Sequence, residues 1–203
     1  MSKLEHLRTL TITLGLAALT AAGACSKKKE SGGSTAKPTE AAPVDLSAIN
    51  GAVPKDLAGK LTFAAATAED GDLAVVAPAG WEQSKFMPGQ WKPASDSSLG
   101  FMTSYSIGSN CDGSCEPKDW KAVADKVNFS QLTSRMKVKT DDQQPGSRLV
   151  VASSDDSTYV AAAWWKDGAS RYYTCSATLA DDAAKAVDAF VKACQATQVN
   201  SWE

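Results

Sequence analysis

The first two dozen residues fix the compartment in which this chain folds. A basic start, with Lys3 and Arg8, precedes an uncharged, mainly apolar run over residues 10–19, and small residues follow at 21–24. This order is typical of a secretory signal peptide, and the apolar run is too short to span a bilayer. We therefore expect residues 1–24 to be removed as a signal peptide. The mature chain then folds outside the cytoplasm, where cysteines pair as disulfides.

Cys25 stands directly after Ala22, Gly23 and Ala24. A cysteine in this place resembles the lipobox of bacterial lipoproteins, whose new N-terminal cysteine carries the acyl chains. The resemblance implies that Cys25 is the lipidation site and that an acyl anchor of the palmitate type holds the chain on a membrane. The alternative is a plain signal peptide cut nearby, which leaves Cys25 as a spare thiol.

Ser26 follows Cys25 where some lipoproteins carry aspartate. This resembles the sorting pattern of outer-membrane lipoproteins in Gram-negative bacteria. It implies a lipid-anchored place in the cell envelope, at the outer membrane, facing the periplasm or the cell surface.

Composition divides the mature chain into a tether and one domain. Residues 26–38 contain no large apolar side chain, so this segment cannot bury enough surface to offset its ordering entropy. We expect residues 25–48 to be the lipidated cysteine and a disordered tether, with a mean reach of roughly 25 Å. Residues 49–203 are long and apolar enough for a single domain.

The charge of the domain argues against nucleic acid as a partner. From residue 41 onward the chain has fifteen Lys and Arg against twenty Asp and Glu, a net charge of −5. An acidic domain without basic clusters does not neutralise phosphates.

Alternating and helical periods predict an α+β domain with a mostly antiparallel sheet. Strands are expected near 61–64, 73–76, 100–105, 136–138, 149–151, 159–165 and 170–177, with a turn at 69–72. Trp120, Val123 and Val127 recur at helical spacing after Pro117, which predicts an inserted helix. A C-terminal helix is expected over 182–197, with Thr178 or Asp181 as its cap.

The segment Pro78-Ala79-Gly80-Trp81 follows an apolar strand. With the later strands and the closing helix, it resembles the opening of the PsbP/Mog1-like family. The resemblance implies an α/β/α sandwich. That family has several unrelated binding and assembly roles and no common catalytic site, so no site residue follows from it.

Four cysteines remain besides Cys25, an even number in an exported chain. Two disulfides are expected, with three possible connectivities. We favour Cys111–Cys115, across a short loop, and Cys175–Cys194, between the last strand and the last helix. The alternative makes Cys111 and Cys115 a redox pair or metal ligands. A thioredoxin-type motif has two intervening residues rather than three, and a zinc site needs further ligands.

The mature chain lacks histidine, because His6 leaves with the signal peptide. Histidine-activated nucleophiles and the commonest metal ligand are therefore missing, and no metal or cofactor is expected. Histidine-independent hydrolysis stays open. It would need a Ser close to a Lys, as in the string 134–137, or two carboxylates across one cleft. The candidate carboxylate pairs are 141–142, 155–156 and 181–182.

Asp167-Gly168 predicts a two-residue hairpin loop between the two most aromatic strands. In that register Tyr159, Trp165 and Tyr172 share one face with small and hydroxyl side chains, while Trp164, Tyr173 and Cys175 share the other. Cys175 should meet the last helix, so the second face is expected in the core. The first face is either a binding surface or is covered by the helix that carries Trp120.

These patterns together predict a non-catalytic, membrane-anchored envelope module. It would bind an envelope protein or polymer, in addition to the lipid that holds its anchor. The alternative is a histidine-independent hydrolase acting on peptidoglycan or other glycans.

We predict that Cys25→Ser leaves the chain without acyl groups and uncleaved by the lipoprotein-specific peptidase, because the thiol is the acyl acceptor. Metabolic labelling with a fatty-acid probe measures this directly. Equal labelling of the variant and the parent would show that the anchor is elsewhere or absent.

Overall fold

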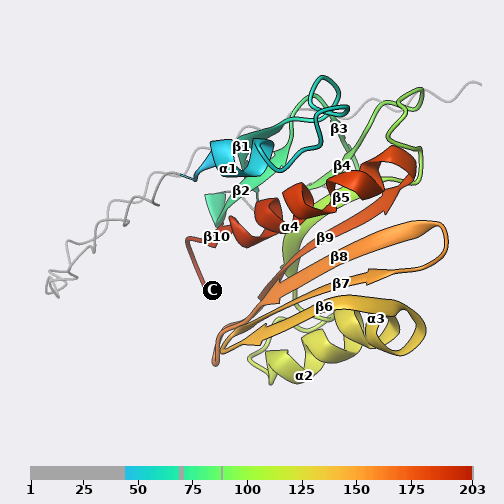
Figure 1. Ribbon diagram of the computed structural model, residues 1–203. Helices are drawn as coiled ribbons and strands as arrows, with labels where there is room; N and C mark the ends of the chain where they lie inside the picture. The colour runs from blue at the N-terminus through green and yellow to red at the C-terminus, as the bar shows by residue number, and fades with distance from the viewer. Residues whose placement is uncertain (1–43, 69–70, 88, 203) are drawn as a thin grey trace, which may run out of the picture. The chain divides into compact units, whose positions relative to one another are not determined.

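The computed structural model describes residues 44–68, 71–87 and 89–202 (Figure 1). The predicted signal peptide, Cys25 and the tether as far as residue 43 lie outside the described residues. So do Glu69 and Asp70 of the predicted turn.

Within the described ranges, no helix is long and apolar enough to cross a membrane.

Ordered structure begins before the expected domain boundary at Ile49. Helix α1 (Leu46–Asn50) is capped by Asp45, whose side chain accepts hydrogen bonds from the backbone N–H groups of Ser47 and Ala48 at 3.0 and 3.3 Å. Ile49 is buried, and Leu46 packs against the same core. The last residues assigned to the tether therefore belong to the domain.

Two antiparallel sheets form the β structure of the described residues. The larger has the order β3-β4-β5-β9-β8-β7-β6, and the smaller the order β1-β2-β10. The strands are β1 (Phe63–Ala68), β2 (Leu73–Pro78), β3 (Glu82–Gln83), β4 (Gln90–Lys92), β5 (Ser104–Asn110), β6 (Lys137–Gln144), β7 (Ser147–Ser153), β8 (Ser157–Trp164), β9 (Tyr172–Ala180) and β10 (Gln198–Val199).

Helices cover both faces of the larger sheet. The inserted segment comprises α2 (Trp120–Ala124), a π-helical turn (Asp125–Phe129) and α3 (Ser130–Arg135). The C-terminal segment comprises a 3-10 helix (Asp181–Ala186) and α4 (Val187–Gln195). Figure 1 shows α2 and α3 on one side of this sheet and α4 on the other. The expected α+β class, with an inserted and a C-terminal helix, is confirmed.

The main core lies between α4 and the two sheets. The ring of Phe190 lies 5.1 Å from that of Phe63 and 5.7 Å from that of Tyr105. The buried Tyr105 hydroxyl donates a hydrogen bond of 2.8 Å to the carbonyl oxygen of Val76 and so ties the larger sheet to the smaller one. Burial without a charge partner raises the pKa of Tyr105, so its phenol stays neutral.

Both predicted disulfides are present. Cys175–Cys194 joins β9 to α4, and Cys111–Cys115 closes a loop directly after β5. The Cα–Cα distances are 5.7 and 4.7 Å, within the usual range for disulfides.

The predicted caps of the last helix are wrong. β9 continues through Thr178 to Ala180, where the Thr103 hydroxyl accepts the Ala180 N–H at 3.1 Å. Asp181 then adopts a left-handed φ of 48° and starts a 3-10 helix whose first turn has no side-chain cap. Pairing of β9 with both of its neighbours therefore outweighs the local capping preference.

The connection between β8 and β9 is longer than predicted. A turn does form at Asp167-Gly168, but it lies inside the segment 165–171. Trp164 therefore pairs with Tyr173, and Ala163 with Thr174 rather than with Tyr172. The register moves by two residues, a full pleat period, so each side chain keeps its predicted face.

The predicted binding face of Tyr159, Trp165 and Tyr172 is covered by the inserted helices. Trp165 and Tyr172 are buried, and Tyr159 is half-buried at the border of the same cluster. The Trp120 ring lies 5.3 Å from the ring of Tyr172, and its indole N–H donates to the Ala169 carbonyl oxygen at 2.8 Å. These residues form a second core, so the binding-surface hypothesis for this face is wrong.

We expect Trp165→Ala to destabilise the domain by about 3 to 5 kcal/mol, because it empties a packed site beneath α2. Trp164 is only half-buried, and Trp164→Ala should cost about 1 to 2 kcal/mol. Urea unfolding of both variants measures the difference between these two neighbours. A larger loss for Trp164→Ala would contradict this packing.

Candidate functional site

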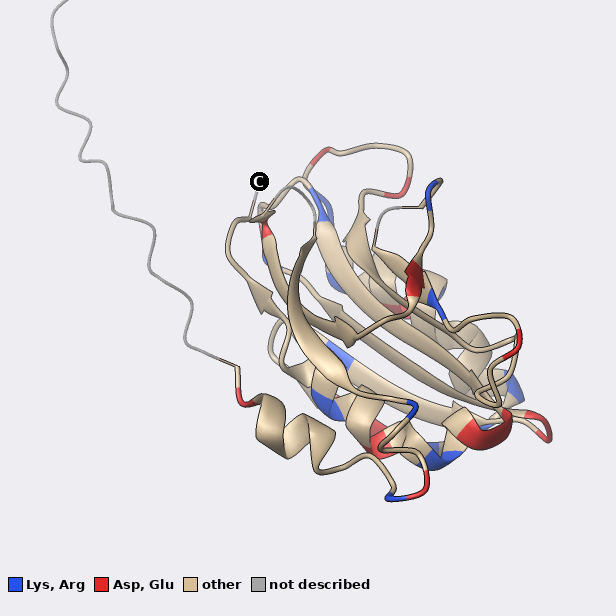
Figure 2. Ribbon diagram, turned by 90° about the horizontal axis from the view of Figure 1, so that it is seen from above, with Lys and Arg blue, Asp and Glu red and all other residues tan. Residues whose placement is uncertain are grey.

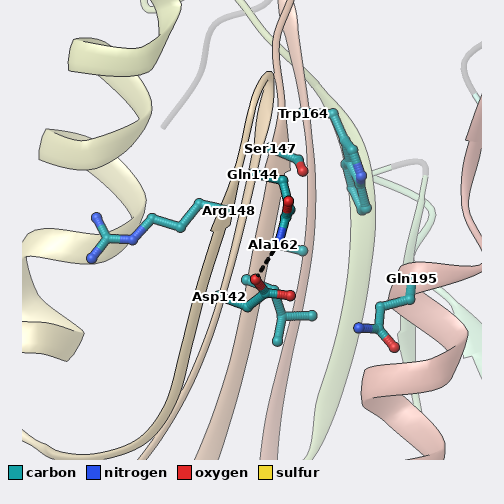
Figure 3. A pocket seen from close by; sticks show the side chains of 8 residues that line it. Asp142, Gln144, Ser147, Arg148, Ala162, Trp164 and Gln195 are labelled. Carbon is teal, nitrogen blue, oxygen red and sulfur yellow. Dashed lines mark hydrogen bonds between the residues drawn. The ribbon is translucent and has the colours of Figure 1, made fainter.

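A groove opens where α4 ends and the larger sheet continues beyond it. Its walls come from the β6–β7 hairpin on one side and from the ends of β8 and α4 on the other (Figure 3). The side chains that line it are Asp142, Gln144, Ser147, Leu149, Ala162, Trp164 and Gln195. The backbone of Arg148, between Ser147 and Leu149 in β7, also borders the groove, but its side chain points to the opposite side of the sheet.

Strand β6 supplies one wall because it is the free edge of the sheet. All eight of its residues are exposed, and alternate side chains point to opposite faces. Asp142 and Gln144 point into the groove, and the Gln144 side-chain amide donates a hydrogen bond of 2.8 Å to the Asp142 carboxylate. The wall therefore presents a carboxylate and an amide in a fixed relation.

Trp164 supplies the opposite wall at the end of β8. Its strand partner Tyr173 is buried, with its ring 5.3 Å from that of Trp202 and nearly perpendicular to it. The Tyr173 hydroxyl donates to the Ser201 carbonyl oxygen at 2.8 Å. The C-terminal segment thus supports the strand pair that carries Trp164, and the half-buried indole stands as a fixed apolar surface.

An ion-pair cluster on the reverse of the sheet holds the β6 wall in place. Arg148 pairs with Asp141 of β6 at 2.8 Å and with Asp125 of the π-helical turn at 2.9 Å. Its guanidinium also lies 4.9 Å from the Phe129 ring centroid. Hydrogen bonds from Arg148 lower the pKa of the Asp141 carboxyl. The exposed edge strand is thereby fastened to the inserted helices.

The three predicted carboxylate pairs have different environments. Asp141 and Asp142 are separated onto the two faces of β6. Asp155, Asp156 and Asp181 line an open depression together with Lys139. Asp182 pairs with Lys185 at 2.7 Å, which lowers the pKa of its carboxyl. The pair 155–156 thus shares a depression with a further carboxylate, that of Asp181.

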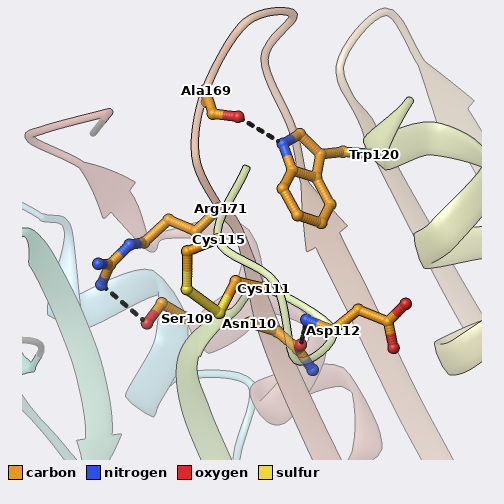
Figure 4. The surroundings of a disulfide bond; sticks show 8 residues. All are labelled: Ser109, Asn110, Cys111, Asp112, Cys115, Trp120, Ala169 and Arg171. Carbon is orange, nitrogen blue, oxygen red and sulfur yellow. Dashed lines mark hydrogen bonds between the residues drawn. A yellow bond between two sulfur atoms is a disulfide. The ribbon is translucent and has the colours of Figure 1, made fainter. Parts of the chain in front are cut away.

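The other chemical alternatives meet specific obstacles. Cys111 and Cys115 are joined in a closed loop, where the Asn110 side chain accepts the Asp112 N–H at 2.7 Å (Figure 4). Ser134 lies in α3 rather than in a strand, and its hydroxyl donates to the Ser130 carbonyl oxygen. In the part of the chain that the structure describes, no cluster of three His, Cys, Asp or Glu side chains is arranged to hold a metal ion.

The groove is not predicted from the sequence. Asp142 enters there only as half of a candidate carboxylate pair, and Trp164 is expected in the core. The available signal was the run 137–144, whose side chains are polar at nearly every position and therefore predict an exposed edge strand.

No protein-family model matches the chain, and no curated protein matches it in sequence. Among solved structures, its fold is similar to the 1.9 Å crystal structure of the Ran-binding protein Mog1p from Saccharomyces cerevisiae. The TM-score is 0.49, with 9% sequence identity over 70% of this chain and 97% of that one. No family, residue or partner is transferred from that structure to this chain.

The Arg148 cluster predicts a loss of stability in acid. The folded pKa of Asp141 lies below its ordinary value of 3.8, so its contribution to stability is complete above that value and is lost as the pH falls through the folded pKa. Asp141→Asn should therefore be less stable than the parent at pH 7, with the difference shrinking below about pH 4.

Urea unfolding between pH 2.5 and 7 measures this effect, and Asp142→Asn is the control with the same change in formal charge. If Asp142→Asn reproduced the pH profile of Asp141→Asn, the ion pair with Arg148 would not be its cause.

Proposed function

We propose that this chain is a lipid-anchored, non-catalytic module of the bacterial envelope whose groove binds a glycan strand. The observation that carries the proposal is the chemistry of the two groove walls. One wall is the indole of Trp164, and the other is the hydrogen-bonded carboxylate and amide of Asp142 and Gln144.

The lining matches the two kinds of surface that a sugar ring offers. The face of a pyranose is made of C–H groups, which pack on an aromatic ring because the negative ring face attracts them. Its rim carries hydroxyls, each of which donates and accepts hydrogen bonds. Asp142 accepts only, whereas the amides of Gln144 and Gln195 do both. Trp164 would therefore take the face of a sugar, and the polar wall its rim.

The charge distribution supports a ligand with little charge. Lysines and arginines are interspersed with acidic residues along much of the ribbon in Figure 2, and the carboxylates that do gather line the separate depression of Asp155, Asp156 and Asp181. The groove itself carries one ionisable lining side chain turned toward its interior, Asp142. This setting favours a hydroxyl-rich polymer over a polyphosphate.

Binding is favoured over hydrolysis by the number of acids in the groove. Glycosidases commonly place two carboxyl groups on either side of the scissile bond, and the groove lining supplies one. The depression lined by Asp155, Asp156 and Asp181 does gather carboxylates, which keeps a hydrolase as the runner-up. Its lining contains no aromatic side chain on which a sugar could stack.

The proposed address rests on the N-terminal sequence. Acylation of Cys25 would keep the domain on a tether with a mean reach of roughly 25 Å from the membrane surface, next to the envelope polymers. A module placed there would link a membrane to the polymer next to it.

Substitution of two neighbouring glutamines tests whether the groove is the binding site. We expect Gln144→Ala to weaken binding of peptide-free peptidoglycan glycan strands by about three- to tenfold, the worth of one or two hydrogen bonds. Trp164→Ala should weaken it by roughly thirtyfold. Gln143→Ala is the matched control, because that residue is equally exposed in β6 but lies on the other face.

Isothermal titration of the purified protein measures these affinities, and an assay for reducing ends runs beside it. Equal effects of the two glutamine variants would reject the groove. Release of reducing ends that stops in Asp155→Asn or Asp181→Asn would establish the hydrolase instead.

A further inference from the structure

Most of the large apolar side chains that are exposed among the described residues lie in two loops. Phe86 and Met87, in the loop between β3 and β4, are 94% and 55% exposed. Phe101 and Met102, in the loop between β4 and β5, are 75% and 58% exposed. These are four of the six large apolar side chains that are exposed among the described residues, so their placement next to β4 is not a general property of the surface.

The described residues of the first loop make defined contacts beside the exposed Phe86 and Met87. The Ser84 hydroxyl accepts the N–H groups of Phe86 and Met87 at 3.3 and 3.1 Å. Behind the tip, Gly89 has a φ of 82°, and its carbonyl oxygen accepts the Ile107 N–H at 2.8 Å. A Cβ at Gly89 would lie only 2.0 Å from the Ile107 carbonyl oxygen. The loop therefore lies directly on β5, and glycine is required for that contact.

Cationic side chains flank the apolar tip. Lys85 and Lys92 line the same surface depression as Phe86 and Met87, with Glu82 as its acidic member. An apolar tip between lysines is suited to the boundary of a bilayer, where the apolar groups enter the acyl region and the ammonium groups stay at the phosphates.

The loop is on the part of the domain that the inserted helices leave open. Figure 1 shows β3 and β4 away from α2 and α3. A tether with a mean reach of roughly 25 Å would let an acyl group on Cys25 keep a membrane within reach of this loop.

We propose that the loop carrying Phe86 and Met87 inserts into the headgroup and acyl boundary of a phospholipid membrane. The contact is a second attachment beside the acyl chains, and it fixes the orientation of the domain on the membrane. It rests on the proposed anchor for its location, but the loop chemistry is independent of acylation and can be tested without it.

The first experiment measures flotation with vesicles of phosphatidylethanolamine and phosphatidylglycerol. It uses the mature chain carrying Cys25→Ser, which lacks an anchor. The unaltered loop should give weak but measurable binding, and Phe86→Ser with Met87→Ser should reduce its affinity about tenfold. Val127→Ser, at an exposed apolar position in the π-helical turn, is the control and should float as the parent does. Equal flotation with and without Phe86 and Met87 would overturn the proposal.

The second experiment uses the lipidated full chain in the same vesicles. A benzophenone side chain at position 86 should crosslink to phospholipid. The same group at position 127 is the control, because Val127 is 50% exposed but lies in the π-helical turn on the other side of the sheet. Equal lipid crosslinking from both positions, or protein crosslinks alone from position 86, would reject the membrane contact.

The two experiments separate failure of the anchor from failure of the loop. Failure of the anchor would appear as a parent chain without fatty-acid label at Cys25 that still floats through Phe86 and Met87. Failure of the loop would appear as a labelled chain that gives no lipid crosslinks from position 86.

Discussion

The structure depends on burial of both faces of strand β9. Tyr172 and Tyr173 are neighbours in sequence and are both fully buried, one in each of the two cores. A strand of this kind needs cover on each side. Exposure of either ring to water would lose the free energy gained by burying its apolar surface. Helix α4, attached through Cys175–Cys194, covers one face, and the helix that begins at Trp120 covers the other.

The groove follows from unequal cover of these faces. Helix α4 packs on β8 and β9 and ends at Gln195, whereas the sheet continues through β7 to β6. The inserted helices reach further on the reverse side, where Arg148 connects the π-helical turn to β6. One face of the β6–β7 hairpin is thus supported from behind and open in front. That combination gives a rigid but accessible surface, as a binding site requires.

The fold class, the presence of two disulfides and the faces of the aromatic residues in β8 and β9 could be predicted from the sequence, whereas the disulfide pairing was favoured among three alternatives. These depend on local period and on cysteine count, which are visible in a single chain. The length of the β8–β9 connection was not visible, because the Asp167-Gly168 turn is equally compatible with a tight hairpin and with a longer loop. Exposure was predicted least well. Whether Trp164 or Trp165 meets solvent depends on how far each helix extends over the sheet, which is a property of the assembled layers.

The open edge of β6 has a further consequence in the proposed anchored state. Molecules confined to a plane encounter one another at an effective concentration far above that of the same number in solution, and unpaired strand edges then become sites of mutual adhesion. β6 carries Lys137 and Lys139 and has an irregular register between Val138 and Thr140. Both features oppose edge-to-edge pairing, so they allow dense lateral packing of the chain without the growth of sheets from one copy to the next.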